Sequence, residues 1–129
     1  MKPIYLDNNA TTRVDPAVVD AMLPFFTEHF GNASSIHAFG SEVGKALKKA
    51  RSQVQALLGA EHDSEIIFTS CGTESDSTAI LSALKAQPDR NTVITTNVEH
   101  PAILTLCDCL EKEGYIVHKL KVDKKGRID

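Results

Sequence analysis

The sequence is poor in aromatic residues and cysteine, and it contains no tryptophan. Of its 129 residues, 5% are aromatic and 3 are cysteines. No apolar run reaches the roughly 20 residues that a bilayer-spanning helix needs, and the first residues lack a signal-peptide core. An odd number of cysteines in a chain of this kind argues against a disulfide framework. We therefore expect reduced thiols, a cytoplasmic location and no membrane association.

Clusters of one charge are also lacking. The formal net charge is −3, and no basic run is longer than Lys124-Lys125, so we expect no nucleic-acid partner. Four of the histidines have no mutual spacing typical of a metal site, and Cys107 and Cys109 diverge on a helix because they are two residues apart. We expect no bound metal, and we expect Cys107 to belong to the core.

Helical patterning fills the first half of the chain. Asp15 followed by Pro16 is typical of a helix start, and Pro24 is expected to kink that helix. A second, long amphipathic helix is expected to end at Gly59. Its apolar positions recur at helical spacing: Val43, Leu47, Ala50, Val54 and Leu57.

Strands and helices alternate from Glu65 onward. This alternation predicts an α/β fold with a largely parallel sheet. About three strands is small against the usual five or six, so the fold looks incomplete. The expected elements are a strand at 65–69, a helix near 74–86, a strand at 92–96, a helix near 101–113 and a strand near 115–121.

Two strand-to-helix junctions are candidate ligand sites, because ligands bind beyond the carboxyl ends of strands in open α/β sheets. In the first, Gly72 allows close backbone approach to an anion, and Thr73 and Ser75 can donate hydroxyls. In the second, His100 follows a strand and Pro101 opens a helix. Helix capping alone explains either junction. Together they suggest a phosphorylated aromatic ligand.

Cys71 has two interpretations. Its place beside a helix start can depress the thiol pKa and make it a nucleophile that acts with His100. A small, buried structural cysteine is the more common case. A serine hydrolase and a P-loop are excluded, because neither the G-x-S-x-G motif nor a lysine at Walker spacing is found.

Four segments identify a family. They are YLDNNATT at 5–12, FGNASSIH at 30–37, IFTSCGTES at 67–75 and VEHPA at 98–102. In this order they resemble the NifS-like cysteine desulfurases of the class V aminotransferase family, over essentially the whole chain. The resemblance implies a homodimeric pyridoxal 5'-phosphate enzyme of fold type I. Such an enzyme converts L-cysteine to L-alanine and passes sulfur, as a persulfide, to an iron-sulfur scaffold protein. Nitrogenase metalloclusters are the expected destination.

The resemblance also implies site residues. Gly72 and Thr73 would hold the cofactor phosphate, and His100 would stack on the pyridine ring. Asn8, Ala10 and Thr11 would lie near the substrate. Two positions depart from the family pattern: Ala33 stands where proline is frequent, and Cys71 where glycine is frequent. We do not assign Cys71 the role of the sulfur-accepting cysteine.

No catalytic residue is assigned within this chain. The Schiff-base lysine, the carboxylate partner of the pyridine nitrogen and the persulfide cysteine are expected downstream of Asp129. The chain is thus expected to be the N-terminal part of the enzyme, inactive by itself. We expect an arm at 1–14, small-domain helices at 15–59 and the incomplete start of the large α/β cofactor-binding domain at 60–129.

Two alternatives stay open at this point. Another fold-type I pyridoxal-phosphate enzyme, such as a selenocysteine lyase or an aminotransferase, would share the phosphate turn and the stacking histidine. A non-catalytic, flavodoxin-like phosphate-binding module would share the alternation of strands and helices, although it does not require the long helical lead of residues 15–59.

Overall fold

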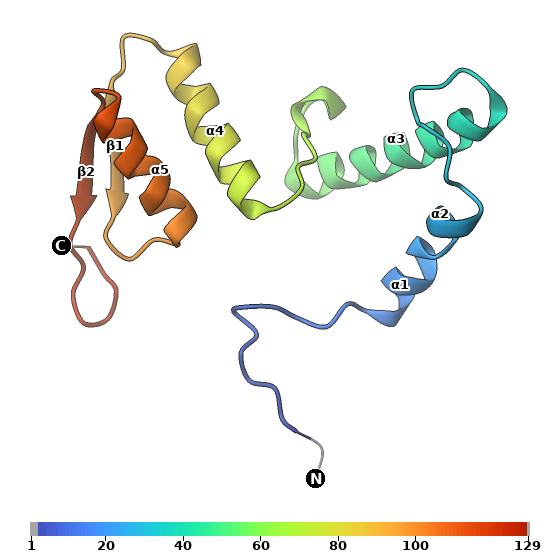
Figure 1. Cartoon of the computed structure of the whole chain (residues 1–129), viewed down its shortest axis with the longest axis horizontal. Coiled ribbons are helices and arrows are strands. Elements are labelled where there is room, and N and C mark those ends of the chain that lie inside the picture. The colour runs from blue at the N-terminus through green and yellow to red at the C-terminus, as the bar shows by residue number, and fades with distance from the viewer. Residues whose placement is uncertain (1–2, 129) are drawn as a thin grey trace. The chain divides into compact units, whose positions relative to one another are not determined.

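The structure, a computed structural model, describes residues 3–128 (Figure 1). Its contacts divide the chain into two compact units, Met1–Ile66 and Ile67–Asp129. Each unit has its own secondary structure, and each is described by itself below. Among the described residues, no helix combines the length and the apolar character that crossing a membrane requires.

The first unit is helical. Asp15 caps its first helix by accepting a hydrogen bond from the Ala17 amide at 2.8 Å, as the sequence predicted. Instead of one kinked helix, Pro24 begins a second short helix, since proline fits the first turn but not the interior. Gly59 ends the long helix with φ of 69°, which confirms that stop. The elements are α1 (Pro16–Met22), α2 (Pro24–Thr27), α3 (Ala38–Leu58) and the 3₁₀ turn η1 (Asp63–Glu65).

Glycine at two positions allows the loop at 31–37 to pack closely against the first turns of α3. Gly40 is buried, and a Cβ placed there would lie closer than 3.0 Å to the backbone oxygens of Asn32 and Ser35. A Cβ on Gly31 would lie equally close to the backbone oxygen of Phe39. Because the obstacles are backbone atoms, no side-chain rotation relieves them. The loop and helix can approach this closely only with glycine at both positions.

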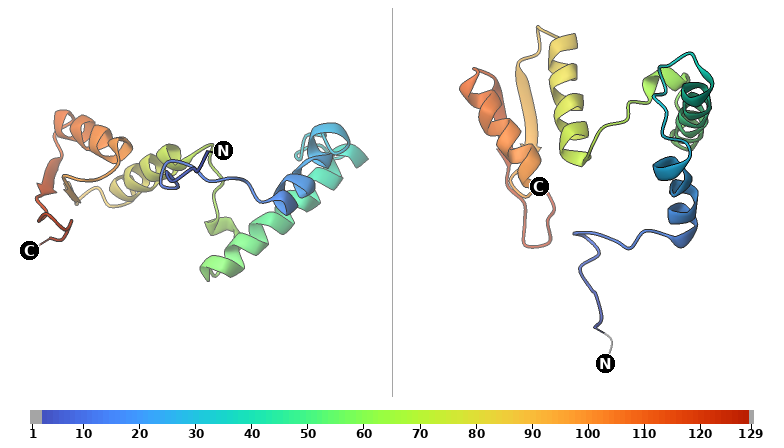
Figure 2. Two further views of the ribbon diagram at one scale, coloured as in Figure 1. Left: turned by 90° about the horizontal axis from the view of Figure 1, so that it is seen from below. Right: turned by 45° about the vertical axis from the view of Figure 1, so that its right-hand side comes forward.

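The second unit is an α/β unit. A parallel ladder joins β1 (Thr92–Thr96) to β2 (Ile116–Leu120), with Thr92 opposite Ile116. Helix α5 (Pro101–Lys112) is the crossover between the strands and packs on β2, and α4 (Gly72–Ala86) packs against α5. Figures 1 and 2 show the first turns of α4 and α5 at the same end of this unit. Cys107 is fully buried on α5, which confirms its place in the core.

The strand predicted at 65–69 is wrong. Residues Asp63–Glu65 form η1, and the segment that follows is extended without entering a ladder. Among residues 3–128 the sheet consists of β1 and β2 alone. A β-rich apolar run becomes a strand only when a neighbouring strand accepts its hydrogen bonds. The described sheet therefore has two strands rather than the three that were expected.

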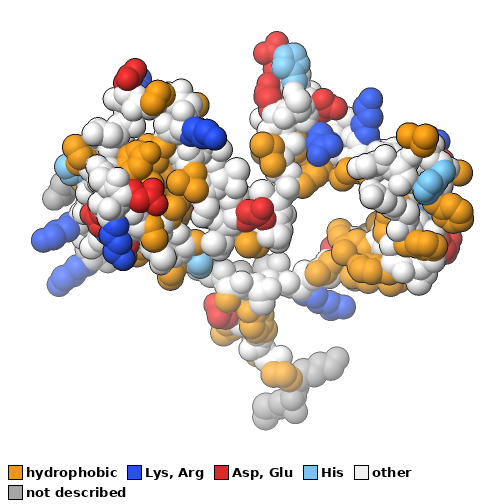
Figure 3. Space-filling view, turned by 45° about the horizontal axis from the view of Figure 1, so that its top comes forward, with side chains coloured by type: hydrophobic (Ala, Val, Ile, Leu, Met, Phe, Trp, Pro, Cys, Tyr) orange, Lys and Arg blue, Asp and Glu red, His pale blue; other side chains and the backbone are white. Residues whose placement is uncertain are grey.

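One face of this sheet is uncovered. Val93, Thr95 and Val117 are half-buried, whereas Ile94 is 66% exposed on the opposite face, beside Ile116 and Leu120. Figure 3 shows hydrophobic side chains gathered at the molecular surface. Parallel sheets are normally covered on both faces. The described residues therefore supply only part of the layer structure that this sheet requires.

An ion-pair cluster ties α5 to β2 and predicts a pH dependence. Lys119 on β2 contacts the carboxylates of Asp108 and Glu111 on α5. Hydrogen bonding from Lys119 lowers the pKa of Asp108, and the same carboxylates raise the pKa of Lys119. Because the pKa of Asp108 is lower in the folded state, its ionised carboxylate stabilises the fold at pH values above the ordinary carboxyl range. This stabilisation is lost as the pH falls through the folded-state pKa.

We expect amide hydrogen exchange in β2 to accelerate as the pH falls below the ordinary carboxyl range, beyond the intrinsic pH effect. The variant Lys119→Met should exchange faster at neutral pH and lack this acid-side change, while Lys121→Met should behave like the wild type. Equal pH profiles for Lys119→Met and the wild type would contradict a stabilising cluster.

Candidate functional site

The turn before α4 is a network of short hydrogen bonds. The amide and hydroxyl of Ser70 donate to the Glu74 carboxylate at 2.7 and 2.6 Å. These bonds lower the pKa of Glu74 and keep it ionised in the first helical turn, where the helix dipole favours a negative charge. Thr69 shares a hydrogen bond with the Ser75 hydroxyl. Ser75, which the sequence suggested as a donor to a ligand, is thus engaged within the turn.

Cys71 is exposed, so the interpretation as a small buried cysteine is wrong. It is the N-cap residue of α4. The Glu74 amide, the Ser70 hydroxyl and the Thr73 amide near its sulfur lower the thiol pKa. The start of α4 thus favours negative charge on two side chains of this turn, those of Glu74 and Cys71.

Gly72 and Thr73 form the first positions of α4. Neither the Gly72 amide nor the Thr73 hydroxyl makes a hydrogen bond with another described residue. A Cβ built on Gly72 would meet nothing within 4 Å, so the space beside its backbone is open. An amide and a hydroxyl next to open space suit a phosphate group. The residues present therefore fit the group that the sequence predicted.

His100 caps α5 with its ring. Its Nδ1 accepts a hydrogen bond from the Ala102 amide at 3.2 Å. Just before it, the Thr96 hydroxyl donates to the Glu99 carboxylate at 2.8 Å, which closes the loop after β1. The capping bond uses the Nδ1 lone pair and therefore places the ring proton on Nε2. The imidazole is held as a flat, oriented surface at the carboxyl end of β1.

One pocket brings Thr73 and His100 together. Its volume is about 450 Å³, and residues of α4 and α5 line it. Gly72 is adjacent to this pocket without lining it. Sequence reasoning missed Ser77, which is one helical turn beyond Thr73; the spacing of four residues was the signal that could have found it. The lining residues are Thr73, Ser77, His100, Pro101, Ala102, Thr105, Leu106 and Cys109.

The predicted substrate-proximal residues lie in the arm of the first unit. Asn8 begins a turn in which the amides of Ala10 and Thr11 approach the Asp7 carbonyl, at 3.1 and 3.4 Å. All three residues are exposed. Their proximity to a substrate stays a prediction.

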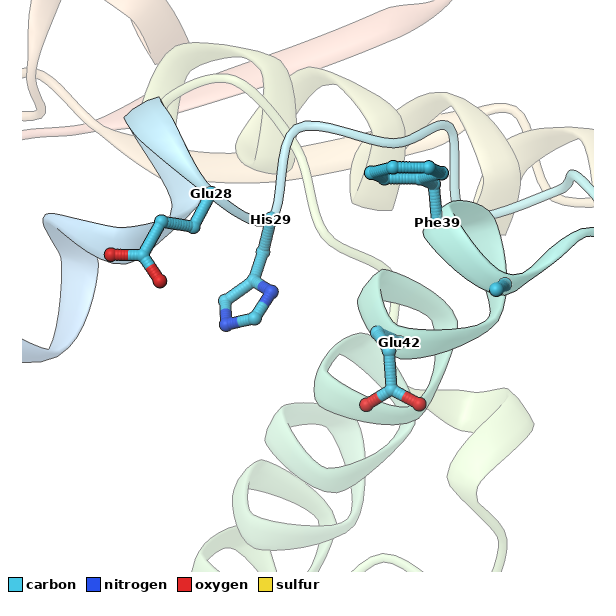
Figure 4. Close-up of a pocket in the computed structure, with 5 residues that line it drawn as sticks. Glu28, His29, Phe39 and Glu42 are labelled. Carbon is cyan, nitrogen blue, oxygen red and sulfur yellow. The ribbon is translucent and has the colours of Figure 1, made fainter.

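A second pocket, of about 240 Å³, lies within the first unit. Figure 4 shows Glu28 and His29 on one wall and Phe39 and Glu42 on the other. The Glu42 carboxylate forms an ion pair with Lys45 at 2.8 Å, and this bond lowers the pKa of Glu42. Residues 3–128 contain no group of three or more His, Cys, Asp and Glu side chains that could hold a metal ion. This pocket contains none of the predicted cofactor-binding residues.

Family comparison identifies the chain. The family model described as "Aminotransferase class-V" matches residues 4–129. The chain belongs to the class V aminotransferase family. Pyridoxal 5'-phosphate is the cofactor of this family, so the cofactor expected from the four segments is confirmed at the family level.

Curated relatives of this class V aminotransferase chain are cysteine desulfurases. "Cysteine desulfurase NifS" of Azotobacter vinelandii is 78% identical over 129 residues, and "Cysteine desulfurase" of Gluconacetobacter diazotrophicus is 67% identical over 130 residues. Each alignment covers 100% of this chain and 32% of the relative. The chain thus spans about a third of the length of these curated relatives. The resemblance to NifS-like desulfurases is confirmed.

Solved structures confirm the fold. A structure titled "NIFS-LIKE PROTEIN" matches with a TM-score of 0.90 and 39% identity, over 98% of this chain and 35% of that chain. Another, titled "SspA in complex with cysteine", matches with a TM-score of 0.82 and 33% identity, over 90% of this chain and 33% of that chain. The predicted fold, the N-terminal part of a fold-type I transferase, is therefore correct.

Proposed function

We propose that the full-length protein is a pyridoxal-phosphate-dependent cysteine desulfurase. It releases sulfur from L-cysteine, leaves L-alanine and supplies iron-sulfur cluster assembly. The observation that carries the proposal is the pocket between α4 and α5, which is lined by both Thr73 and His100, whose ring is oriented by its capping bond. The relatives named as desulfurases support the same reaction.

The described residues would bind and orient the cofactor. The Gly72 amide and the Thr73 hydroxyl would hold the phosphate, and the His100 ring would stack on the pyridine. When bound, pyridoxal phosphate supplies an electron sink for negative charge that develops on the substrate. Aromatic stacking positions that ring without a covalent bond, so the described residues hold the cofactor and leave the bond-making groups to other parts of the protein.

Sulfide and alanine formation tests this function. The full-length protein, loaded with pyridoxal phosphate and supplied with L-cysteine and a thiol reductant, should form equal amounts of alanine and sulfide. A keto acid formed without sulfide would indicate an aminotransferase and overturn the proposal. Preference for L-selenocysteine with no turnover of L-cysteine would indicate a selenocysteine lyase.

Substitutions of His100 can separate its proposed stacking on the cofactor from its capping of α5. Asparagine is a good N-cap residue but has no ring, so His100→Asn should keep the start of α5 and lose the stacking surface. We expect it to weaken pyridoxal-phosphate binding by roughly three- to tenfold, the equivalent of about 0.5–1.5 kcal/mol of aromatic contact. Titration of the apoprotein with cofactor measures this effect.

Phenylalanine is the matched replacement, since it restores a ring without the capping nitrogen. His100→Phe should bind cofactor more tightly than His100→Asn, although its helix α5 is less stable. If both variants bind cofactor like the wild type, the ring of His100 does not contact the cofactor.

The full-length protein is further proposed to act as a homodimer in the cytoplasm. An iron-sulfur scaffold protein is the proposed sulfur acceptor, and nitrogenase metalloclusters are the proposed destination. The relative named NifS in Azotobacter vinelandii supports the nitrogenase connection.

A further inference from the structure

Some hydroxyl groups in and just before the first turns of α4 form hydrogen bonds within the protein, and others do not. Ser75 shares its hydroxyl with Thr69, and the Ser70 hydroxyl donates to Glu74. The hydroxyls of Thr73 and Ser77 make no hydrogen bond with any other described residue. Among the hydroxyls of α4 that make no such bond, those of Thr73 and Ser77 belong to the residues that line the pocket.

Helical geometry places these two hydroxyls on one face. Residues four apart are neighbours on a helix surface, roughly 5–6 Å apart at Cβ, whereas Ser75 lies two positions away and points elsewhere. A tetrahedral phosphate offers several oxygens and can accept hydrogen bonds from both hydroxyls at once. Ser77 is half-buried within the pocket wall, which limits competition from water.

We propose that Ser77 is a phosphate-binding residue of the cofactor pocket and acts with Thr73 as a pair of hydroxyl donors. This inference rests on the proposed function, because it takes the anionic ligand to be the phosphate of pyridoxal phosphate. His100, on the α5 side of the same pocket, faces the aromatic part of the ligand. Ser77 is thus a cofactor-binding residue that adds a second hydroxyl where sequence adjacency had suggested Ser75.

The test compares Ser77→Ala with Ser82→Ala in the full-length apoprotein. Ser82 is an exposed serine farther along the same helix, so its replacement has the same chemical change outside the pocket. Dissociation constants are measured by calorimetry for pyridoxal phosphate and for pyridoxal, which lacks the phosphate. We expect Ser77→Ala to bind pyridoxal phosphate about tenfold more weakly, the loss expected for one hydrogen bond to a charged group. Its pyridoxal affinity and all Ser82→Ala affinities should be unchanged.

A second variant distinguishes loss of the Ser77 hydroxyl from a change in the packing of the pocket. Ser77→Thr keeps the hydroxyl and should bind pyridoxal phosphate within about threefold of the wild type. An equal loss of affinity for both ligands in Ser77→Ala would show that Ser77 shapes the pocket without binding phosphate, and would overturn the inference. Wild-type affinity in Ser77→Ala would also overturn it, while leaving the desulfurase proposal intact. A wild-type apoprotein that binds no pyridoxal phosphate would overturn both.

Discussion

Gly40→Ala is expected to destabilise the folded protein by roughly 1–3 kcal/mol, although alanine is the better helix former by about 1 kcal/mol. The added methyl group would collide with the backbone oxygens of Asn32 and Ser35. Both oxygens belong to the loop that packs against α3 at Gly40. Backbone atoms cannot rotate away, so the loop must lift from the helix. The measurement is the urea midpoint of the full-length protein, followed by amide exchange in α3.

Gly44 provides the matched control, one turn farther along α3. A methyl group there would meet only the Ala33 backbone oxygen, at 3.2 Å. Relief of a few tenths of an ångström suffices, and the gain in helix propensity offsets part of that cost. We expect Gly44→Ala to change stability by no more than about 1 kcal/mol. Equal effects of the two substitutions would show that close packing of the loop is not the reason for glycine at position 40.

Thr73→Val is expected to weaken pyridoxal-phosphate binding by roughly 10- to 100-fold, because a hydrogen bond to a charged group contributes about 1.5–3 kcal/mol. Valine preserves the shape of threonine and removes only the hydroxyl. Thr73 stands at the start of α4, and its hydroxyl lines the pocket that also contains His100. Cofactor titration of the full-length apoprotein measures the loss.

Thr78→Val is the matched control on the same helix, since Thr78 is exposed and does not line this pocket. Its cofactor affinity should equal that of the wild type. A similar loss in both variants would mean that valine in α4 disturbs the helix as a whole. An unchanged affinity in Thr73→Val would remove the threonine hydroxyl from the proposed phosphate site.

Local rules predicted most of the elements correctly. The Asp15-Pro16 start and the Gly59 stop each depend on neighbouring residues alone, and the structure has them where they were expected. The strand predicted at 92–96 is also present, because β2 accepts its pairing. The strand predicted at 65–69 failed because a strand depends on partners that are distant in sequence. Pattern reasoning detects a residue's preference for extended structure, but it does not detect whether a neighbouring strand is available.

In the candidate site too, features set by neighbouring residues could be predicted, and features that depend on the three-dimensional path of the chain could not. Thr73 and His100, which were predicted from their junctions and from the family motifs, line one pocket in the structure, and their cofactor contacts stay a prediction. Ser77 was not found as a pocket residue, since the sequence reasoning considered hydroxyls next to Gly72 and not the residue one helical turn beyond Thr73. Cys71 was misjudged because its exposure depends on the path of the turn, which hydrogen bonds to Glu74 determine.

The order in which the pocket assembles follows from the short crossover between its walls. Both walls come from the segment between Gly72 and Lys112, with only β1 and two loops between the helices. Closing a loop of this length costs little entropy, and contacts that are near in sequence form early in folding. A growing chain could therefore shape this part of its proposed cofactor site while the ribosome is still synthesising the residues that follow.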